Sequence, residues 1–86
     1  MKLNLNHNLI GLDGQEIAES NLGKLVANIL ASSNKGDAAK MWHWALKLHA
    51  GEELELDPSD LETLKVFIKD NEQLTVLSKA QIIASL

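Results

Sequence analysis

Polar and apolar residues alternate over the first residues of the chain. Leu3 and Leu5 fall on one side of an extended segment and polar residues on the other, which is the pattern of a half-buried strand. Residues 9–12 form a second apolar run that could pair with this strand or with residues 15–17. The two pairings direct different side chains inward, so the pattern predicts either a β-hairpin or a three-stranded meander.

A turn signal follows the second apolar run at Asp13-Gly14. This dipeptide favours the positive φ angles that a two-residue type I′ turn requires. A turn of this kind would place Ile10 and Ile17 opposite each other on one face of the hairpin.

Polar residues that can cap helices divide the remainder of the chain into about four amphipathic helices. Ser20 or Asn21 can cap the first helix, Asp37 the second, and Asp57, which precedes Pro58, the third. Each cap stands before a stretch with apolar residues at helical spacing. The chain is therefore predicted to change from strands to helices near residue 20.

The sequence indicates some boundaries of these helices more clearly than others. Gly51 stands where a left-handed residue commonly ends a helix. The third helix could begin two residues later if Ser59 and Glu62 formed a capping box. A last helix could fold back or swap into a neighbouring copy. Its expected inward stripe is Leu77, Ala80, Ile83 and Ala84.

Length and composition favour one α+β domain over residues 1–86. We expect an N-terminal β-hairpin or three-stranded meander packed on about four α-helices. The 86 residues include no cysteine, so packing or self-association must stabilise so small a domain. No apolar run has the ~18 residues of a membrane span, so we expect a cytoplasmic protein with no membrane partner.

The second helix carries apolar residues around roughly 200° of its circumference. A helix at the rim of a domain needs about half of that, so this helix is either central or also faces a partner. Trp42 and Trp44 lie about 200° apart and cannot share one pocket. Either both rings pack within the domain, or one is an exposed anchor for another protein. For the anchor we favour Trp44, on the flank nearer Lys40 and Lys47, with Leu46 as further apolar surface.

A strip of acidic residues follows the second helix. Alternation places Glu53, Glu55 and Asp57 on one side of an extended segment, opposite Leu54 and Leu56. This strip could bind a basic partner or mimic a phosphate backbone. Alternatively, the acids favour the dipole of the next helix and keep the protein dissolved.

The sequence contains no pattern typical of catalysis, metal binding or nucleotide binding. His43 and His49 lie about 240° apart on a helix, and His7 lies in a polar turn, so the histidines are not expected to share a metal ion. Gly11 and Gly14 belong to the hairpin and lack the lysine and hydroxyl of a phosphate loop. We therefore expect no enzyme, no cofactor and no metal.

The charge pattern also limits the partners. The net charge is −4, and all eight basic residues are lysines, which argues against phosphate and base recognition by arginine. The leading hypothesis is a non-enzymatic protein-protein interaction module whose partner is unknown and could be a second copy, forming a homo-oligomer. The alternative is a small regulator that associates with nucleic acid, because compact helical domains often have that role.

Three segments carry a resemblance to a known group of proteins. The hairpin motif from Leu9 to Ile17, the apolar repeat from Leu22 to Leu30 and the tryptophan-containing helix from Lys40 to Leu48 resemble small proteins encoded in phage and prophage regions of bacterial genomes. The resemblance covers most of the chain. It implies a bacterial or phage origin and a single-domain accessory protein, and it assigns no activity or functional residue.

Overall fold

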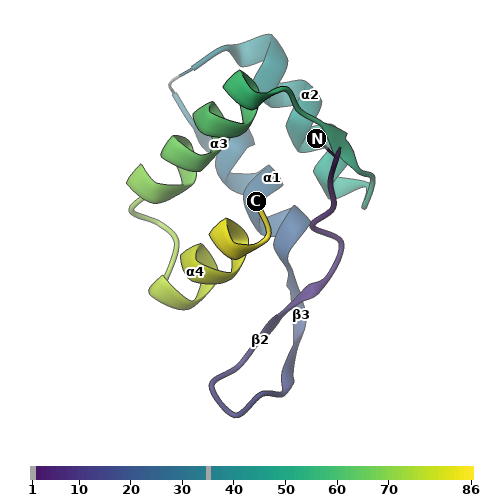
Figure 1. The fold of residues 1–86 in the computed structure, drawn as a ribbon, viewed down its shortest axis with the longest axis vertical. Helices are drawn as coiled ribbons and strands as arrows, with labels where there is room; N and C mark the ends of the chain where they lie inside the picture. The colour runs from purple at the N-terminus through teal and green to yellow at the C-terminus, as the bar shows by residue number, and fades with distance from the viewer. Residues whose placement is uncertain (1, 35) are drawn as a thin grey trace.

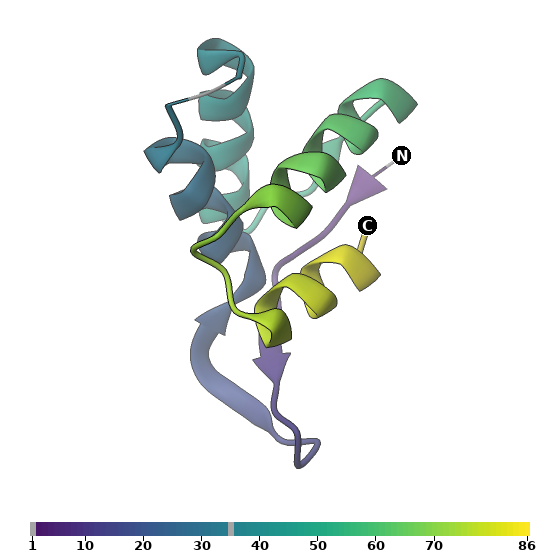
Figure 2. The same ribbon diagram turned by 90° about the vertical axis from the view of Figure 1, so that its left-hand side faces the viewer.

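The computed structural model describes residues 2–34 and 36–86. Within them the elements follow in the order β1 (Lys2–Leu3), β2 (Asn8–Ile10), β3 (Glu16–Asn21), α1 (Leu22–Ser32), α2 (Ala38–His49), β4 (Leu54–Glu55), α3 (Pro58–Asp70) and α4 (Val76–Ala84). Figure 1 shows the β2–β3 hairpin extending beyond the helices, and Figure 2 shows α1 and α2 on one side of the molecule with α3 and α4 on the other. The fold is α+β, as the sequence predicts.

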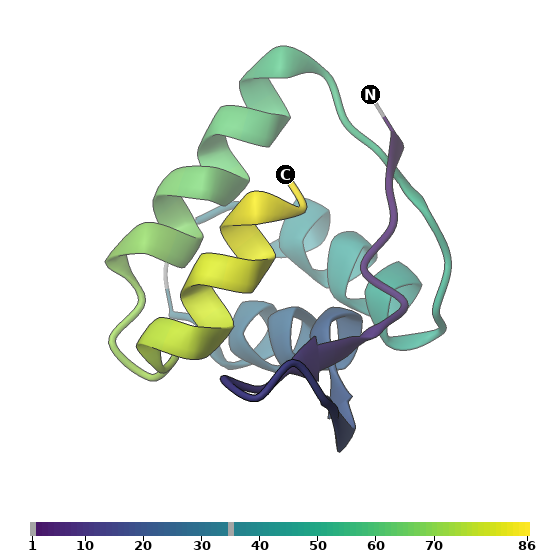
Figure 3. The ribbon, with the colours of Figure 1, turned by 60° about the horizontal axis from the view of Figure 1, so that its bottom comes forward.

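The strands form two separate antiparallel pairs. β2 pairs with β3, which confirms the hairpin, whereas β1 pairs with β4 through Lys2–Glu55 and Leu3–Leu54. Figure 3 shows β1 and β4 side by side along one edge. The three-stranded meander is therefore wrong. Pairing with β4 buries the side chains of Leu3 and Leu54 together in the core.

The hairpin turn differs from the predicted type I′ turn. The N–H of Gly11 donates to the carbonyl of Gln15 at 2.7 Å, and the N–H of Gly14 donates to the carbonyl of Gly11 at 3.0 Å. Gly14 has a φ of +81°, while Asp13 is not at positive φ and accepts from the N–H of Gln15 through its carboxylate. The loop thus has three residues, with a left-handed glycine last. This turn places Ile10 opposite Glu16, so the predicted pairing of Ile10 with Ile17 is wrong.

β3 bulges away from β2 between the paired ends of the hairpin. Glu19 absorbs part of the bend at a φ of 59°. The hydroxyl of Ser20 fills the gap, because it accepts from the N–H of Leu9 at 3.0 Å and donates to the carbonyl of Ile17 at 2.6 Å. A side chain therefore replaces the missing backbone partner of β2.

Gln81 on α4 connects the hairpin to the helices. Its side-chain oxygen accepts from the N–H of Ile10 at 2.8 Å, and its side-chain nitrogen donates to the carbonyl of Ile10 at 2.6 Å. The amide thus makes both hydrogen bonds that a neighbouring strand would make. It holds the hairpin against α4, which folds back onto its own chain.

This contact also explains an error in the predicted stripe of α4. Turning Gln81 toward β2 turns Ile82 into the core and Ala80 and Ala84 toward solvent. Ser78 is buried on the same side as Ile82, and its hydroxyl accepts a hydrogen bond from the Thr75 hydroxyl at 3.0 Å. The remaining residues of the predicted stripe, Leu77 and Ile83, are half-buried.

The predicted caps of the first three helices are confirmed. The side chain of Asn21 accepts from the N–H of Lys24, and that of Asp37 accepts from the N–H of Lys40. Asp57 accepts from the N–H of Asp60 at 2.7 Å, with Pro58 in the first turn of α3, so the later start at Ser59 is wrong. Each cap satisfies a backbone donor that the helix itself leaves without a partner.

Gly51 ends α2 as expected. Its φ is +79°, its N–H donates to the carbonyl of Leu48, and the N–H of Glu52 donates to the carbonyl of Lys47. These two bonds form a Schellman motif. The motif reverses the chain and leads it into β4.

The core draws on all the helices and on both strand pairs. At its centre, Leu3 and Leu5 of the N-terminal segment are almost fully buried, as their alternation predicts. The buried apolar residues are Leu3, Leu5, Leu9, Leu22, Val26, Ala27, Ile29, Leu30, Met41, Trp44, Ala45, Leu48, Leu54, Leu56, Leu64, Ile68 and Ile82.

The start of α1 lies unusually close to two other segments. The N–H of Gly23 donates to the carbonyl of Leu5 at 2.9 Å, and the N–H of Leu22 donates to the carbonyl of His7 at 2.8 Å. A Cβ atom at Gly23 would lie 2.9 Å from the carbonyl oxygen of Leu48 at the end of α2. Glycine is therefore needed here for the close approach of three backbone segments.

We expect Gly23→Ala to lower the free energy of unfolding by ~1–3 kcal/mol, because the added methyl group overpacks against backbone that cannot rotate away. The measurement is urea unfolding of the two proteins. Asn28→Ala, on the exposed side of the same helix, is the control and should shift stability by less than ~0.5 kcal/mol. Equal stability of Gly23→Ala and the native protein would contradict the steric role of Gly23.

We expect Gln81→Ala to raise the hydrogen-exchange rate of the Ile10 amide about fivefold, the factor that corresponds to ~1 kcal/mol for one hydrogen bond. Gln81→Glu keeps an acceptor for that amide and should have a smaller effect. The amide of Ile68 in the core is the internal control. Unchanged exchange at Ile10 in Gln81→Ala would show that Gln81 does not hold the hairpin.

Candidate interaction surface

α2 has one apolar face in the core and a second one toward solvent. Met41, Trp44 and Leu48 are buried, whereas Trp42 is 56 % exposed and Leu46 is 52 % exposed. Trp42 and Leu46 are four residues apart and therefore lie on the same side of the helix, which also carries Ala38 and Ala39. We call Ala38, Ala39, Trp42 and Leu46 the outer face of α2. The core does not cover the full apolar circumference of this helix, as its pattern predicts.

The exposed tryptophan is not the one that the sequence favoured. Trp44 is 5 % exposed, so its assignment as an exposed anchor is wrong. It is buried because it shares a continuous stripe with Met41 and Leu48, and this stripe faces the core. Trp42 lies outside that stripe but shares a side with Leu46. The four-residue spacing predicts that Trp42 and Leu46 share one side of the helix, but it pairs Trp44 with Leu48 in the same way, so it does not indicate which pair is exposed.

Lys40 contacts two groups of its own chain. Its ammonium lies 2.8 Å from the carboxylate of Asp60 on α3 and 5.9 Å from the centroid of the Trp44 ring. The hydrogen bond to Asp60, followed by the Coulombic attraction of the same carboxylate, raises the pKa of Lys40 above its usual value. Lys40, predicted to bind a partner, thus links α2 to α3 beside Trp44.

Lys47 and two of the three residues of the acidic strip line the same recess, although the sequence pattern presents them as separate features. Leu54 and Leu56 are buried while Glu53, Glu55 and Asp57 are exposed, so the predicted alternation is confirmed. Asp57 also caps α3. A recess of about 260 Å³ beside Trp44 and Leu54 is further lined by Lys2, His43, Lys47, Glu53 and Glu55. Cationic and anionic groups thus share one small area.

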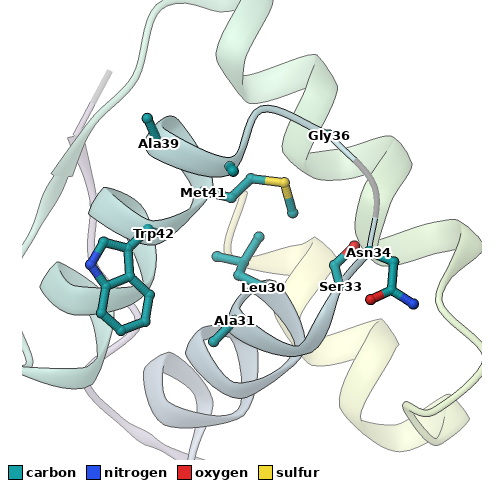
Figure 4. Close-up of a pocket in the computed structure, with 9 residues that line it drawn as sticks. Leu30, Ala31, Ser33, Asn34, Gly36, Ala39, Met41 and Trp42 are labelled. Atoms are coloured by element: carbon teal, nitrogen blue, oxygen red, sulfur yellow. The ribbon is translucent and has the colours of Figure 1, made fainter.

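A second recess adjoins the outer face of α2. It measures about 500 Å³ and lies between the end of α1 and the start of α2. Figure 4 shows the Trp42 ring at one end, with Ala31 of α1 beside it and Leu30 and Met41 farther in. Because small alanine side chains flank the indole ring, an apolar group from outside can reach its face.

Among the described residues, no group of three or more histidine, cysteine, aspartate or glutamate residues is placed to hold a metal ion. In the same residues, every buried side-chain nitrogen or oxygen has a hydrogen-bond partner. No helix in residues 2–34 or 36–86 has both the length and the apolar character to cross a membrane.

Comparison with known proteins adds no assignment. No family model matches this chain, and no match is found among curated proteins or solved structures.

The two tryptophans should differ in their access to a quencher. In dilute solution we expect Trp42→Phe, which keeps Trp44, to show weak acrylamide quenching and blue-shifted emission. Trp44→Phe, which keeps Trp42, should show strong quenching and red-shifted emission, with circular dichroism to check that it is folded. The reason is the difference between the 56 % exposure of Trp42 and the 5 % exposure of Trp44. Strong quenching of Trp42→Phe would contradict the burial of Trp44.

Proposed function

We propose that this chain is a non-enzymatic protein-protein interaction module and that it binds through the outer face of α2. The observation that carries the proposal is the exposure of Trp42 and Leu46, one helical turn apart, beside an apolar recess. Single exposed apolar residues are ordinary on protein surfaces, but adjoining large ones are characteristic of binding sites.

The chemistry of the outer face supports binding to a protein. Tryptophan is enriched among the residues that dominate binding energy, and it contributes most when neighbouring groups exclude water around it. Ala38 and Ala39 keep one side of Trp42 open, and Leu46 extends the apolar area along α2. A partner that supplied a few aliphatic side chains would bury all of these residues.

The charges around the outer face of α2 favour a protein partner over a nucleic-acid partner. Lys40 is paired with Asp60, and Lys47 lies at a recess shared with Glu53 and Glu55. These carboxylates offset the lysines that a phosphate backbone would need. These charges make a nucleic-acid regulator the less favoured function, and a separate titration of the chain with labelled DNA tests for it.

The setting of this function is proposed from the resemblance of residues 9–17, 22–30 and 40–48 to small phage and prophage proteins. We propose an accessory protein of a phage or prophage that acts in the bacterial cytoplasm. Self-association fits a chain of 86 residues with leftover apolar surface, because small domains bury a smaller fraction of their surface than large ones do.

A photo-reactive amino acid at position 46 tests the proposed surface. After irradiation of the purified chain in bacterial extract, we expect a covalent protein adduct, either with a second copy or with another protein. The matched control is the same amino acid at Val76, which is 85 % exposed on α4 and away from the outer face of α2.

Two results would count against the proposal. The first is the absence of any protein adduct from position 46, or adducts of equal yield from positions 46 and 76. The second is tight binding of labelled DNA at low salt that weakens steeply as salt is added, which would favour the nucleic-acid regulator.

A further inference from the structure

A third recess, which the proposed function does not use, lies between α3 and the facing ends of α1 and α2. We call it the α3 recess. It measures about 570 Å³, within the range of roughly 300–1,000 Å³ that is usual for small-molecule sites. It is lined from both sides of the molecule that Figure 2 separates, by α1 and α2 on one side and by α3 on the other. Leu30 and Met41 line both this recess and the one beside Trp42, but Trp42 and Leu46 do not line the α3 recess.

The floor of the α3 recess is apolar and partly aromatic. Three helices contribute its residues, which are Ile29, Leu30, Met41, Trp44 and Phe67. Phe67 is half-buried and packs against the core, and the other four are buried. Because the core already holds these side chains, the floor keeps its shape without a ligand. Such a floor suits the apolar body of a small molecule.

The margin of the recess is acidic where α3 ends. Asp70 lies in the last turn of α3, and Glu72 lies in the loop that follows. The side chain of Asn71 fixes this loop, because its oxygen accepts from the N–H groups of Gln73 at 2.8 Å and of Leu74 at 3.0 Å. The backbone that carries both carboxylates is therefore held in place beside the floor.

No lysine in the described part of the chain is paired with Asp70 or Glu72. Lys40 also lines the recess, but its ammonium lies 2.8 Å from Asp60, in the first turn of α3. Asp60 and Asp70 are about 15 Å apart along the axis of this helix, so Lys40 and Asp70 stand at opposite ends of the recess. Lys79 of α4 reaches the end of α3 but donates to a backbone carbonyl there, at 3.1 Å.

The ends of two helices add to the negative character of the recess. α1 and α3 both end at it, and the last carbonyl groups of a helix carry partial negative charge that favours a cation. The last turn of α1 has no basic residue. The N-terminus of α2 has the opposite polarity, but Asp37 caps it. The recess thus combines an apolar floor with a negative margin.

We infer that the α3 recess binds a small organic amine. Its apolar body packs on the floor at Trp44 and Phe67, and its ammonium group pairs with Asp70 and Glu72. The same charges disfavour a ligand that carries a carboxylate or a phosphate. This inference goes beyond the proposed function, because it concerns a different part of the surface and requires no protein partner.

Two dansyl probes of opposite charge test the inference in the Trp42→Phe variant, in which Trp44 is the only tryptophan. Dansylcadaverine ends in an ammonium group, whereas dansylaminohexanoate has the same aromatic body and the same linker but ends in a carboxylate. Excitation of Trp44 should produce sensitised dansyl emission when a probe binds. We expect dansylcadaverine to bind at least ~5-fold more tightly, the factor that corresponds to one exposed ion pair. Added salt should reduce this preference.

Substitutions at the margin show whether the preference is local. Asp70→Asn combined with Glu72→Gln should remove most of it, because both side chains keep their size and lose their charge. The matched control is Glu19→Gln combined with Glu53→Gln, which removes the same charge from two exposed positions outside the recess. The control should keep the preference, and circular dichroism verifies that each variant is folded.

Three further variants locate the bound probe. Val66→Lys should weaken binding of dansylcadaverine at least ~5-fold, because it adds a cation at the margin of the recess. Val76→Lys adds the same charge at an exposed valine outside the recess and should have little effect. Leu46→Gln changes the outer face of α2 and should also bind like Trp42→Phe.

Four results would overturn the inference. They are no sensitised emission with either probe, equal affinities for the two probes, loss of the preference in the control variant as well, and loss of binding in Leu46→Gln. The last result would place the probe on the outer face of α2. The photo-reactive amino acid at position 46 does not report on the α3 recess, so the inference and the proposed function can fail separately.

Discussion

The close approach of three backbone segments at Gly23 determines how the rest of the chain is arranged. The N-terminal segment satisfies the first donors of α1 through the carbonyls of Leu5 and His7, and the last turn of α2 meets Gly23 through the carbonyl of Leu48. Segments that are distant in sequence are therefore held within van der Waals contact at one point. The chain reversal at Gly51 starts from the same place and leads into β4, which pairs with β1.

The exposure of α2 follows from this junction. With its end held against α1, the helix turns Met41, Trp44 and Leu48 inward, and the salt bridge from Lys40 to Asp60 links the same helix to α3. Trp42 and Leu46 must then face outward, because they lie on a different side of the helix. The packing of the core thus creates the candidate interaction surface. In the proposed function, a partner binds to apolar residues that the core leaves exposed.

Sequence reasoning succeeded where the signal is local and failed where two distant segments decide the outcome. The caps at Asn21, Asp37 and Asp57 were predictable because each involves a side chain and a backbone donor three residues away. The excess apolar circumference of α2 was also readable from its pattern. The sequence pattern could not show which of Trp42 and Trp44 is exposed, because that depends on which side of the helix meets α1 and α3. The rotation of α4 likewise depends on Gln81 reaching Ile10, a contact across 71 residues.

The sequence by itself determined the α+β class, the sites where three helices begin, the end of α2 and the alternation of the acidic strip, because propensity, capping and periodicity act over a few residues. Only the tertiary structure decided the partner of β1, the three-residue turn and bulge of the hairpin, and the identity of the exposed tryptophan. Each of these depends on which backbone donors and apolar faces meet across the core. That information is distributed over the whole chain, since a strand or a helix face is defined by what packs against it.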